Sequence, residues 1–147
     1  MNTEIVEILL VEDNMDDAEL TMRALKKSKI VDRLHITHLV DGELAINYFF
    51  SKDGTYKKPN ELPKVILLDL KLPKVDGIQV LKKLKSDPNT KTIPVVILTS
   101  SHEEKDIVES FNLGVNSYVT KPVEFEQFMD AVANLGLYWA LLNKAPQ

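Results

Sequence analysis

Five short apolar runs rich in β-branched residues alternate along the chain with segments whose apolar residues recur at helical spacing. The runs occupy residues 5–11, 35–40, 65–68, 94–98 and 117–120. Such alternation favours right-handed crossovers between parallel strands, with helices covering both faces of the sheet. We therefore predict an α/β fold, a doubly wound five-stranded parallel sheet in the flavodoxin-like order 2-1-3-4-5.

Composition limits the classes of protein to consider. The chain has 147 residues, 44% of them hydrophobic, which suits one globular domain. It has no cysteine, which excludes disulfides, and its formal net charge of −4 argues against nonspecific nucleic-acid binding. The apolar runs are too short to span a membrane, and the N-terminus does not resemble a signal peptide. We expect a cytoplasmic protein with no membrane or DNA partner.

Local signals mark helix ends and one insertion. Asn14 is expected to cap the first helix through its side-chain oxygen, with Asp17 three residues further on. Gly77 opens a third helix that ends before Pro88, because proline disfavours continuation. Residues 51–64 combine glycine, prolines and lysines, so we predict a surface loop there. This loop is either a partner contact or a tolerated insertion.

Charged side chains follow three of the runs where the predicted strands end. Glu12 and Asp13 follow the first run, Asp69 follows the third, and Lys121 follows the fifth. Ligands of open α/β sheets bind at the carboxyl ends of the strands, so we expect these side chains to converge. Mg²⁺ prefers oxygen ligands, which makes the three carboxylates candidate metal ligands.

The same edge of the sheet could carry phosphoryl chemistry. Asp69 is a candidate nucleophile that would form an aspartyl phosphate, while Lys121 and the Thr99 hydroxyl would contact phosphoryl oxygens. Taken singly, each residue has another explanation: strand-end acids cap helices, Lys-Pro pairs occur in ordinary loops, and Thr99 stands at a natural helix start. Their occurrence together at successive strand ends favours one site.

These residues resemble the receiver domain of two-component response regulators. The matching motifs are Glu12-Asp13, Asp69 within LLDLKLP, Asp76-Gly77, Thr99 within VVILTS, and Tyr118 with Lys121-Pro122 within SYVTKP. Asp69 and Thr99 lie 30 positions apart, and Thr99 and Lys121 lie 22 positions apart, as is usual in receivers. The match covers residues 4 to 134, and we assign residues 1–134 to a receiver domain.

The resemblance implies that a histidine kinase phosphorylates Asp69. The implied Mg²⁺ ligands are Glu12, Asp13, Asp69 and the main-chain carbonyl of Lys71. Thr99 and Lys121 would bind the phosphoryl group, and Tyr118 would be a switch that turns inward as Thr99 shifts. The Lys121–Pro122 bond would be cis, as is usual in receivers. Two positions differ among receivers: Glu12 stands where the first aspartate is frequent, and Lys71 lies beside the site. We expect both residues to affect the rate of dephosphorylation.

We expect residues 135–147 to extend the last helix and to end in a tail. An apolar stripe with spacings of three and four runs through the last predicted helix into this extension. The residues that we assign to an interface are Phe128, Leu135, Tyr138, Trp139 and Leu142. Isolated domains rarely expose an apolar patch of this size, so we predict burial against a second chain. The alternative is a segment that folds back onto its own core after Gly136.

The chain further resembles single-domain regulators that are paired with phytochrome-type sensor kinases. The shared features are the long loop before the phosphoacceptor strand, the phrase FNLGVNSYVTKPV and a tryptophan in a C-terminal extension. The resemblance implies a bacteriophytochrome as the sensor kinase and a homodimer formed through the fourth helix, fifth strand and fifth helix. Only one helix and a tail follow Lys121, so we expect output through protein contact.

The expected function is a phosphorylation-dependent switch that catalyses only its own phosphoryl acceptance and hydrolysis, and is not an enzyme with an external substrate. The alternatives are a phosphate sink or phosphorelay intermediate, or a nonphosphorylated binding module. A Mg²⁺-dependent phosphatase is disfavoured, because Lys71 stands where its acid/base aspartate would be. We interpret His35 and His38 as surface or hydrogen-bonded histidines and assign no role to His102.

Overall fold

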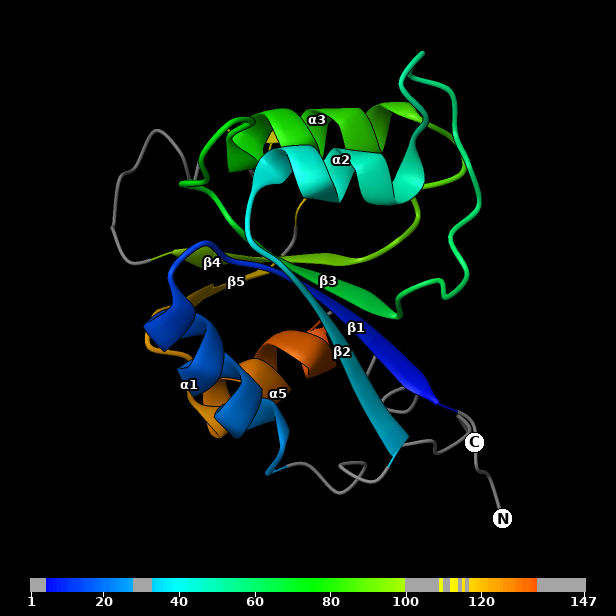
Figure 1. Ribbon diagram of the computed structural model, residues 1–147. Coiled ribbons are helices and arrows are strands. Elements are labelled where there is room, and N and C mark those ends of the chain that lie inside the picture. Colours follow the sequence, from blue (N-terminus) through cyan, green and yellow to red (C-terminus); the bar gives the residue numbers. More distant parts are fainter. Residues whose placement is uncertain are drawn as a thin grey trace.

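The computed structural model describes residues 5–27, 33–99, 109, 112–113, 115 and 117–134 (Figure 1). The strands are β1 (Val6–Val11), β2 (Leu34–Leu39), β3 (Val65–Asp69), β4 (Val95–Thr99) and β5 (Ser117–Thr120). The helices are α1 (Met15–Leu25), α2 (Gly42–Phe49), α3 (Gly77–Ser86) and α5 (Phe125–Asn134). The fourth helix, which the sequence predicts over residues 103–111, lies almost entirely outside the described residues.

The strands form one parallel sheet in the order β2-β1-β3-β4-β5, which confirms the prediction. The register brings the carboxyl ends of neighbouring strands level with one another. Val11 of β1 pairs with Leu68 of β3, and the next residue of β3, Asp69, pairs with Leu98 of β4. Polar residues that follow different strands are therefore delivered to a single edge.

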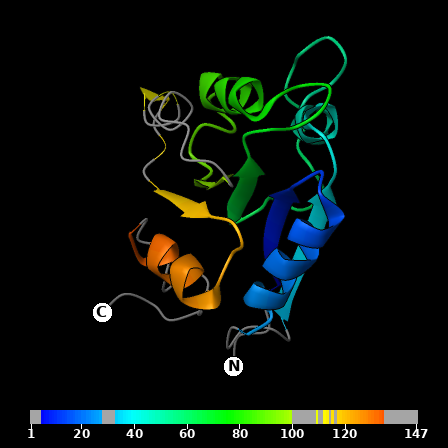
Figure 2. The same cartoon turned by 90° about the vertical axis from the view of Figure 1, so that its left-hand side faces the viewer.

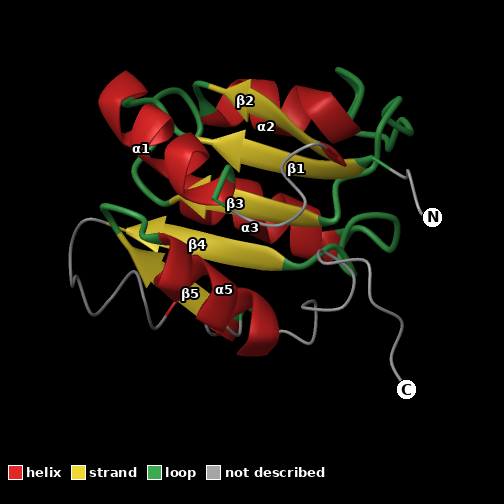
Figure 3. Ribbon diagram, turned by 90° about the horizontal axis from the view of Figure 1, so that it is seen from below, coloured by secondary structure: helices red, strands yellow, loops and turns green. Residues whose placement is uncertain are grey.

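Helices cover both faces of the sheet. Helices α1 and α5 pack on one face, and α2 and α3 pack on the other (Figures 1 and 3); Figure 2 shows the same two layers from the side. Successive residues of a strand point to opposite faces, so Leu10 of β1 joins the core under α1 and α5 while Leu9 joins the core under α2 and α3. Burial on both faces explains why the inner strands β3 and β4 read as continuous apolar runs.

The helix starts near the carboxyl edge have local causes. Asn14 caps α1 as predicted, because its Oδ1 accepts a hydrogen bond from the Asp17 amide at 2.9 Å. Helix α3 starts at Gly77, as predicted, and the Gly77 amide donates to the Leu70 carbonyl at 2.8 Å. A Cβ at position 77 would lie 2.3 Å from the Asp69 carbonyl oxygen. Glycine is therefore required for α3 to begin this close to the end of β3.

Residues 51–64 form an irregular loop beside α2, as predicted from the sequence (Figure 1). Hydrogen bonds fasten this loop to the rest of the domain. Lys83 Nζ donates to the Gly54 carbonyl at 3.0 Å, and it also lies 4.5 Å from the ring centre of Phe50, the residue before the loop. The Tyr48 hydroxyl donates to the Glu61 carbonyl at 2.9 Å. Whether the loop also contacts a partner stays a prediction.

The predicted C-terminal interface falls largely outside the described residues, which end at position 134. Leu135, Tyr138, Trp139 and Leu142 are among the residues not described. Phe128, by contrast, is 2% exposed and packs in the core between the sheet and α5. Its assignment to an interface was wrong, because its side chain is already buried within the domain.

No helix in the described part of the chain is long and apolar enough to cross a membrane.

Candidate functional site

Three carboxylates meet at the carboxyl edge of the sheet. Glu12 and Asp13 follow β1, and Asp69 is the last residue of β3, the neighbouring strand. One oxygen from each of these side chains lies within 4.8 Å of the other two. Glu12 and Asp69 are buried, whereas Asp13 is exposed to solvent. The structure thus brings together the acidic residues that the sequence placed at separate strand ends.

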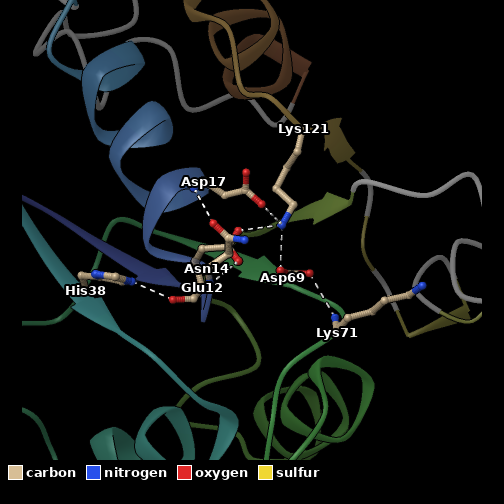
Figure 4. A network of polar contacts seen from close by, with 7 residues as sticks. All are labelled: Glu12, Asn14, Asp17, His38, Asp69, Lys71 and Lys121. Carbon is tan, nitrogen blue, oxygen red and sulfur yellow. Dashed lines mark hydrogen bonds and ion pairs between the residues drawn. The ribbon is translucent and has the colours of Figure 1, made fainter.

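Lys121 reaches this cluster from the loop that follows β5 (Figure 4). Its ammonium lies 2.9 Å from Asp69 Oδ2, 2.9 Å from Glu12 Oε1 and 3.0 Å from Asp17 Oδ2. The Lys121 side chain is only 7% exposed, so its pairs with Glu12 and Asp69 are largely shielded from water, whereas its pair with Asp17 is partly exposed, because the Asp17 side chain is 31% exposed. The Lys121–Pro122 peptide bond is cis, as the family resemblance implied.

Main-chain groups orient the two buried carboxylates. The Lys71 amide donates to Asp69 Oδ1 at 3.0 Å, which leaves Oδ2 facing Lys121. The Asn14 amide donates to Glu12 Oε2 at 3.2 Å. His38 Nε2 contacts the Glu12 carbonyl at 2.7 Å, so this nitrogen must carry a proton to donate the hydrogen bond. The contacts agree with the interpretation of His38 as a hydrogen-bonded histidine.

Burial and the closeness of like charges shift the pKa values of the site residues. Burial raises the pKa of Glu12, and the adjacent Asp69 raises it further, to about 7 from an ordinary value of 4.5, against the opposing effect of Lys121. Burial by itself would lower the pKa of Lys121, but its contacts with the carboxylates outweigh burial and raise that pKa above its ordinary value. One ammonium therefore compensates only part of the negative charge around it.

The donor set fits a hard divalent cation. Carboxylate oxygens are the ligands that Mg²⁺, Mn²⁺ and Ca²⁺ take, and neither histidine nitrogen nor cysteine sulfur belongs to this three-carboxylate cluster. The raised pKa of Glu12 points the same way, because a cation beside these carboxylates would relieve their mutual repulsion.

Thr99 and Tyr118 are the other two predicted site residues, and the structure describes Thr99 only in part. Thr99 ends β4 beside Thr120 of β5, so its backbone stands at the same edge, but its side chain is not described. Tyr118 of β5 is 44% exposed, which places its ring on the outside of the domain.

Asp17 is the site residue that sequence reasoning missed, since it was considered only beside the helix cap. Once Asn14 caps α1, the first turn of that helix must start at the carboxyl edge, and Asp17 lies in that turn. This signal could have placed Asp17 near the strand-end acids. It could not have shown that Lys121 reaches Asp17, because that contact joins residues 104 positions apart.

Residues 8–133 match the response regulator receiver domain family. The regulatory protein FilR2 of Methanothrix harundinacea is 40% identical over 95% of this chain and 86% of its own length. Response regulator Rcp1 of Synechocystis sp. is 43% identical over 90% of this chain and 87% of its own length. The chain belongs to the family of response regulator receiver domains.

Solved structures agree with this assignment. The bacteriophytochrome response regulator AtBRR superimposes with a TM-score of 0.79 and 50% identity, over 95% of this chain and 99% of that one. A Mn²⁺-bound form of Rcp1 superimposes with a TM-score of 0.72 and 36% identity, over 96% of this chain and 97% of that one. The chain is therefore homologous, over nearly its whole length, to regulators that are associated with phytochromes.

Proposed function

We propose that this protein is a response regulator that accepts a phosphoryl group on Asp69 from a histidine kinase and signals through protein contact. The observation that carries the proposal is the setting of Asp69. Its Oδ1 accepts a hydrogen bond from a main-chain amide, its Oδ2 pairs with Lys121, and two further carboxylates lie beside it. A carboxylate held in this way is oriented for nucleophilic attack.

In the proposed reaction, an oxygen of Asp69 attacks the phosphorus of a phosphohistidine, and the bond from phosphorus to the imidazole nitrogen breaks. Lys121, which already contacts Oδ2 of Asp69, would donate to an oxygen of the transferred group. The Thr99 hydroxyl would donate to another. The Lys71 amide, which now holds Oδ1, keeps the carboxylate from rotating. Hydrolysis of the aspartyl phosphate would reset the protein, and no external substrate is required.

Mg²⁺ is the cation that we propose for the site. Glu12, Asp13, Asp69 and the main-chain carbonyl of Lys71 would hold it, and the bound cation would supply charge neutralisation for the phosphoryl oxygens. The cluster of carboxylates and the Mn²⁺-bound form of the relative Rcp1 support this proposal.

Phosphorylation would change the conformation of the domain: Thr99 would shift toward the phosphoryl group and the Tyr118 side chain would turn inward. The outward position of Tyr118 is the one expected of the unphosphorylated state. The change is a shift between two arrangements, and the phosphoryl group drives it only by its stronger contacts with one of them. Binding of a partner to the face around β5 would then depend on phosphorylation.

The cognate kinase that we propose is a bacteriophytochrome-type sensor, in a cytoplasmic signalling pathway. The support is the similarity to AtBRR and Rcp1. We further propose a homodimer that involves the fourth helix, β5 and α5, with Leu135, Tyr138, Trp139 and Leu142 in or beside the interface. We expect Trp139→Ala to weaken self-association, and an unchanged sedimentation profile would contradict the role of Trp139.

Intact mass after incubation with acetyl phosphate and Mg²⁺ tests the proposed chemistry. The wild type should gain one phosphoryl group that is lost in base, and Asp69→Asn should gain none. A folded, Mg²⁺-binding wild type without an adduct would contradict phosphoryl acceptance from this donor, and transfer from a phosphorylated kinase would then separate a donor-restricted receiver from a pure binding module. An adduct of equal yield on Asp69→Asn would place the acceptor elsewhere.

A further inference from the structure

We propose that Asp17 is a positioning residue that holds the Lys121 ammonium at the phosphoryl-acceptor site. The inference rests on the proposed function, because it concerns how Lys121 is kept in place to contact a phosphoryl oxygen. Asp17 Oδ2 lies 3.0 Å from Lys121 Nζ in the ion pair that sequence reasoning missed (Figure 4). Asp17 is not one of the three carboxylates that lie close enough together to share a metal ion.

The contacts of Lys121 divide into two kinds. A lysine ammonium has three N–H donors, and here they face Glu12, Asp69 and Asp17. In the proposed reaction Asp69 becomes phosphorylated and Glu12 becomes a metal ligand, so both change their chemistry during the cycle. Asp17 is the partner of this set that takes no part in either step. It can therefore hold Lys121 before and after phosphoryl transfer.

The geometry allows Lys121 to keep Asp17 while it serves Asp69. The ammonium contacts Asp17 Oδ2 at 3.0 Å and Asp69 Oδ2 at 2.9 Å at the same time. It does not have to release one carboxylate to reach the other. Asp17 thus acts as a fixed anchor rather than as a competitor that draws the ammonium away from the acceptor.

Lys121 needs a residue that fixes its ammonium, because its main chain lies far from the carboxylates that it contacts. It follows β5, an edge strand of the sheet, yet it must reach β1 and β3, with β4 lying between β5 and β3. Its four-carbon side chain is flexible, and a misplaced group slows a reaction even where nothing else changes. A carboxylate in the first turn of α1, on the far side of the ammonium from β5, fixes the end of this side chain (Figure 4).

Asp16 supplies a matched control. It lies next to Asp17 in the same first turn of α1, so removing either charge alters the interaction with the helix N-terminus in a similar way. Asp16 is exposed, and the carboxylates that contact Lys121 among the described residues are Glu12, Asp17 and Asp69. A purely structural role in the helix would affect both variants, whereas a role through Lys121 would affect only Asp17.

The experiment measures the rate of adduct formation with acetyl phosphate and Mg²⁺ by intact mass. We expect Asp17→Ala to slow phosphorylation about fivefold, the factor that corresponds to a partly exposed ion pair. Asp17→Asn, which keeps an oxygen acceptor but not the charge, should fall between Asp17→Ala and the wild type. Asp16→Ala should match the wild type. Equal rates for Asp17→Ala and Asp16→Ala would overturn the inference.

A second readout uses the protein without metal or phosphoryl donor. In ¹H–¹⁵N spectra of lysine ammonium groups at low temperature, the Lys121 signal should exchange slowly in the wild type and in Asp16→Ala. In Asp17→Ala its exchange with water should be faster. An unchanged Lys121 signal in Asp17→Ala would overturn the inference while leaving the proposed function intact. Absence of any Asp69-dependent adduct on the wild type, by acetyl phosphate or by kinase, would overturn both.

Discussion

Strand β1 has a buried glutamate near each end, and the two differ in their surroundings. Glu7 is 2% exposed, and its carboxylate contacts His35 Nδ1 and the Thr37 hydroxyl of the adjacent strand β2. Glu12 is 0% exposed and is surrounded by Lys121 and by the carboxylates of Asp13 and Asp69. Residue type and burial are therefore nearly the same at the two ends.

The difference lies in how each charge is compensated. His35 pairs directly with Glu7 in the register of β1 and β2, so a local contact between neighbouring strands satisfies that carboxylate. Glu12 shares a lysine from 109 positions away with other acids, and its pKa is raised to about 7. A buried glutamate alone does not indicate a functional site. Crowding by like charges at a strand end, with too few cations to compensate, does.

The largest difference between the Glu7 and Glu12 variants should appear in their affinity for Mg²⁺. Glu12→Gln removes a charged oxygen ligand, so we expect the Kd for Mg²⁺ to rise roughly 100-fold. Glu7→Gln, at the other end of the strand, should leave it unchanged. Isothermal titration calorimetry with MgCl₂ checks both values. Equal effects from the two variants would show that Mg²⁺ responds to overall charge and not to this site.

Stability should depend on Glu7. Glu7→Ala leaves the donors on His35 and Thr37 without their acceptor, so we expect the free energy of unfolding to fall by about 2 kcal/mol. Urea denaturation measures this change. Glu61→Ala is the control, because Glu61 is an exposed glutamate near the same end of the sheet and should cost less than about 0.5 kcal/mol. A loss for Glu7→Ala no larger than the control would contradict the structural role.

The pH dependence of the metal-free protein should reveal Glu12. Its folded-state pKa of about 7 lies above its ordinary value of 4.5, so between these values the folded state binds a proton that the unfolded state has lost. The contribution of Glu12 to stability therefore falls as pH rises through this range.

Urea midpoints measured with EDTA across this range, for the wild type and Glu12→Gln, isolate that contribution. We expect the stability of the wild type, relative to Glu12→Gln, to decline as pH rises. Saturating Mg²⁺ should reverse the trend, because the cation binds the deprotonated carboxylate. A difference between the two proteins that does not vary with pH would contradict the raised pKa.

The smallest loss of stability in this comparison should come from substitution of His35, the partner of Glu7. Its side chain is 60% exposed, and both Glu7 and His35 line an open pocket of about 450 Å³, so we expect water to replace the imidazole when it is removed. We expect His35→Ala to lower the free energy of unfolding by less than about 1 kcal/mol. If His35→Ala costs as much as Glu7→Ala in urea denaturation, the imidazole and not the carboxylate is the essential member of the pair.

Much of the fold could be predicted because it depends on local pattern. The short runs rich in β-branched residues identified the strands to within about one residue, as at β2, which was expected at 35–40 and occupies Leu34–Leu39. Phe128 shows where the pattern fails. Its helical stripe indicated a buried face, but spacing alone does not say whether the partner of that face is the domain's own sheet or a second chain.

The sequence by itself determined which strands end in acidic residues and in Lys121, because each of these residues directly follows an apolar run. Only the tertiary structure decided how the charges are shared. Lys121 contacts the carboxylates of Glu12 after β1, Asp17 in α1 and Asp69 of β3, which lie 109, 104 and 52 positions away in the chain. The physical reason is that the strength of an ion pair depends on distance and burial, and for residues so far apart in sequence both are set by the packing of the sheet and helices.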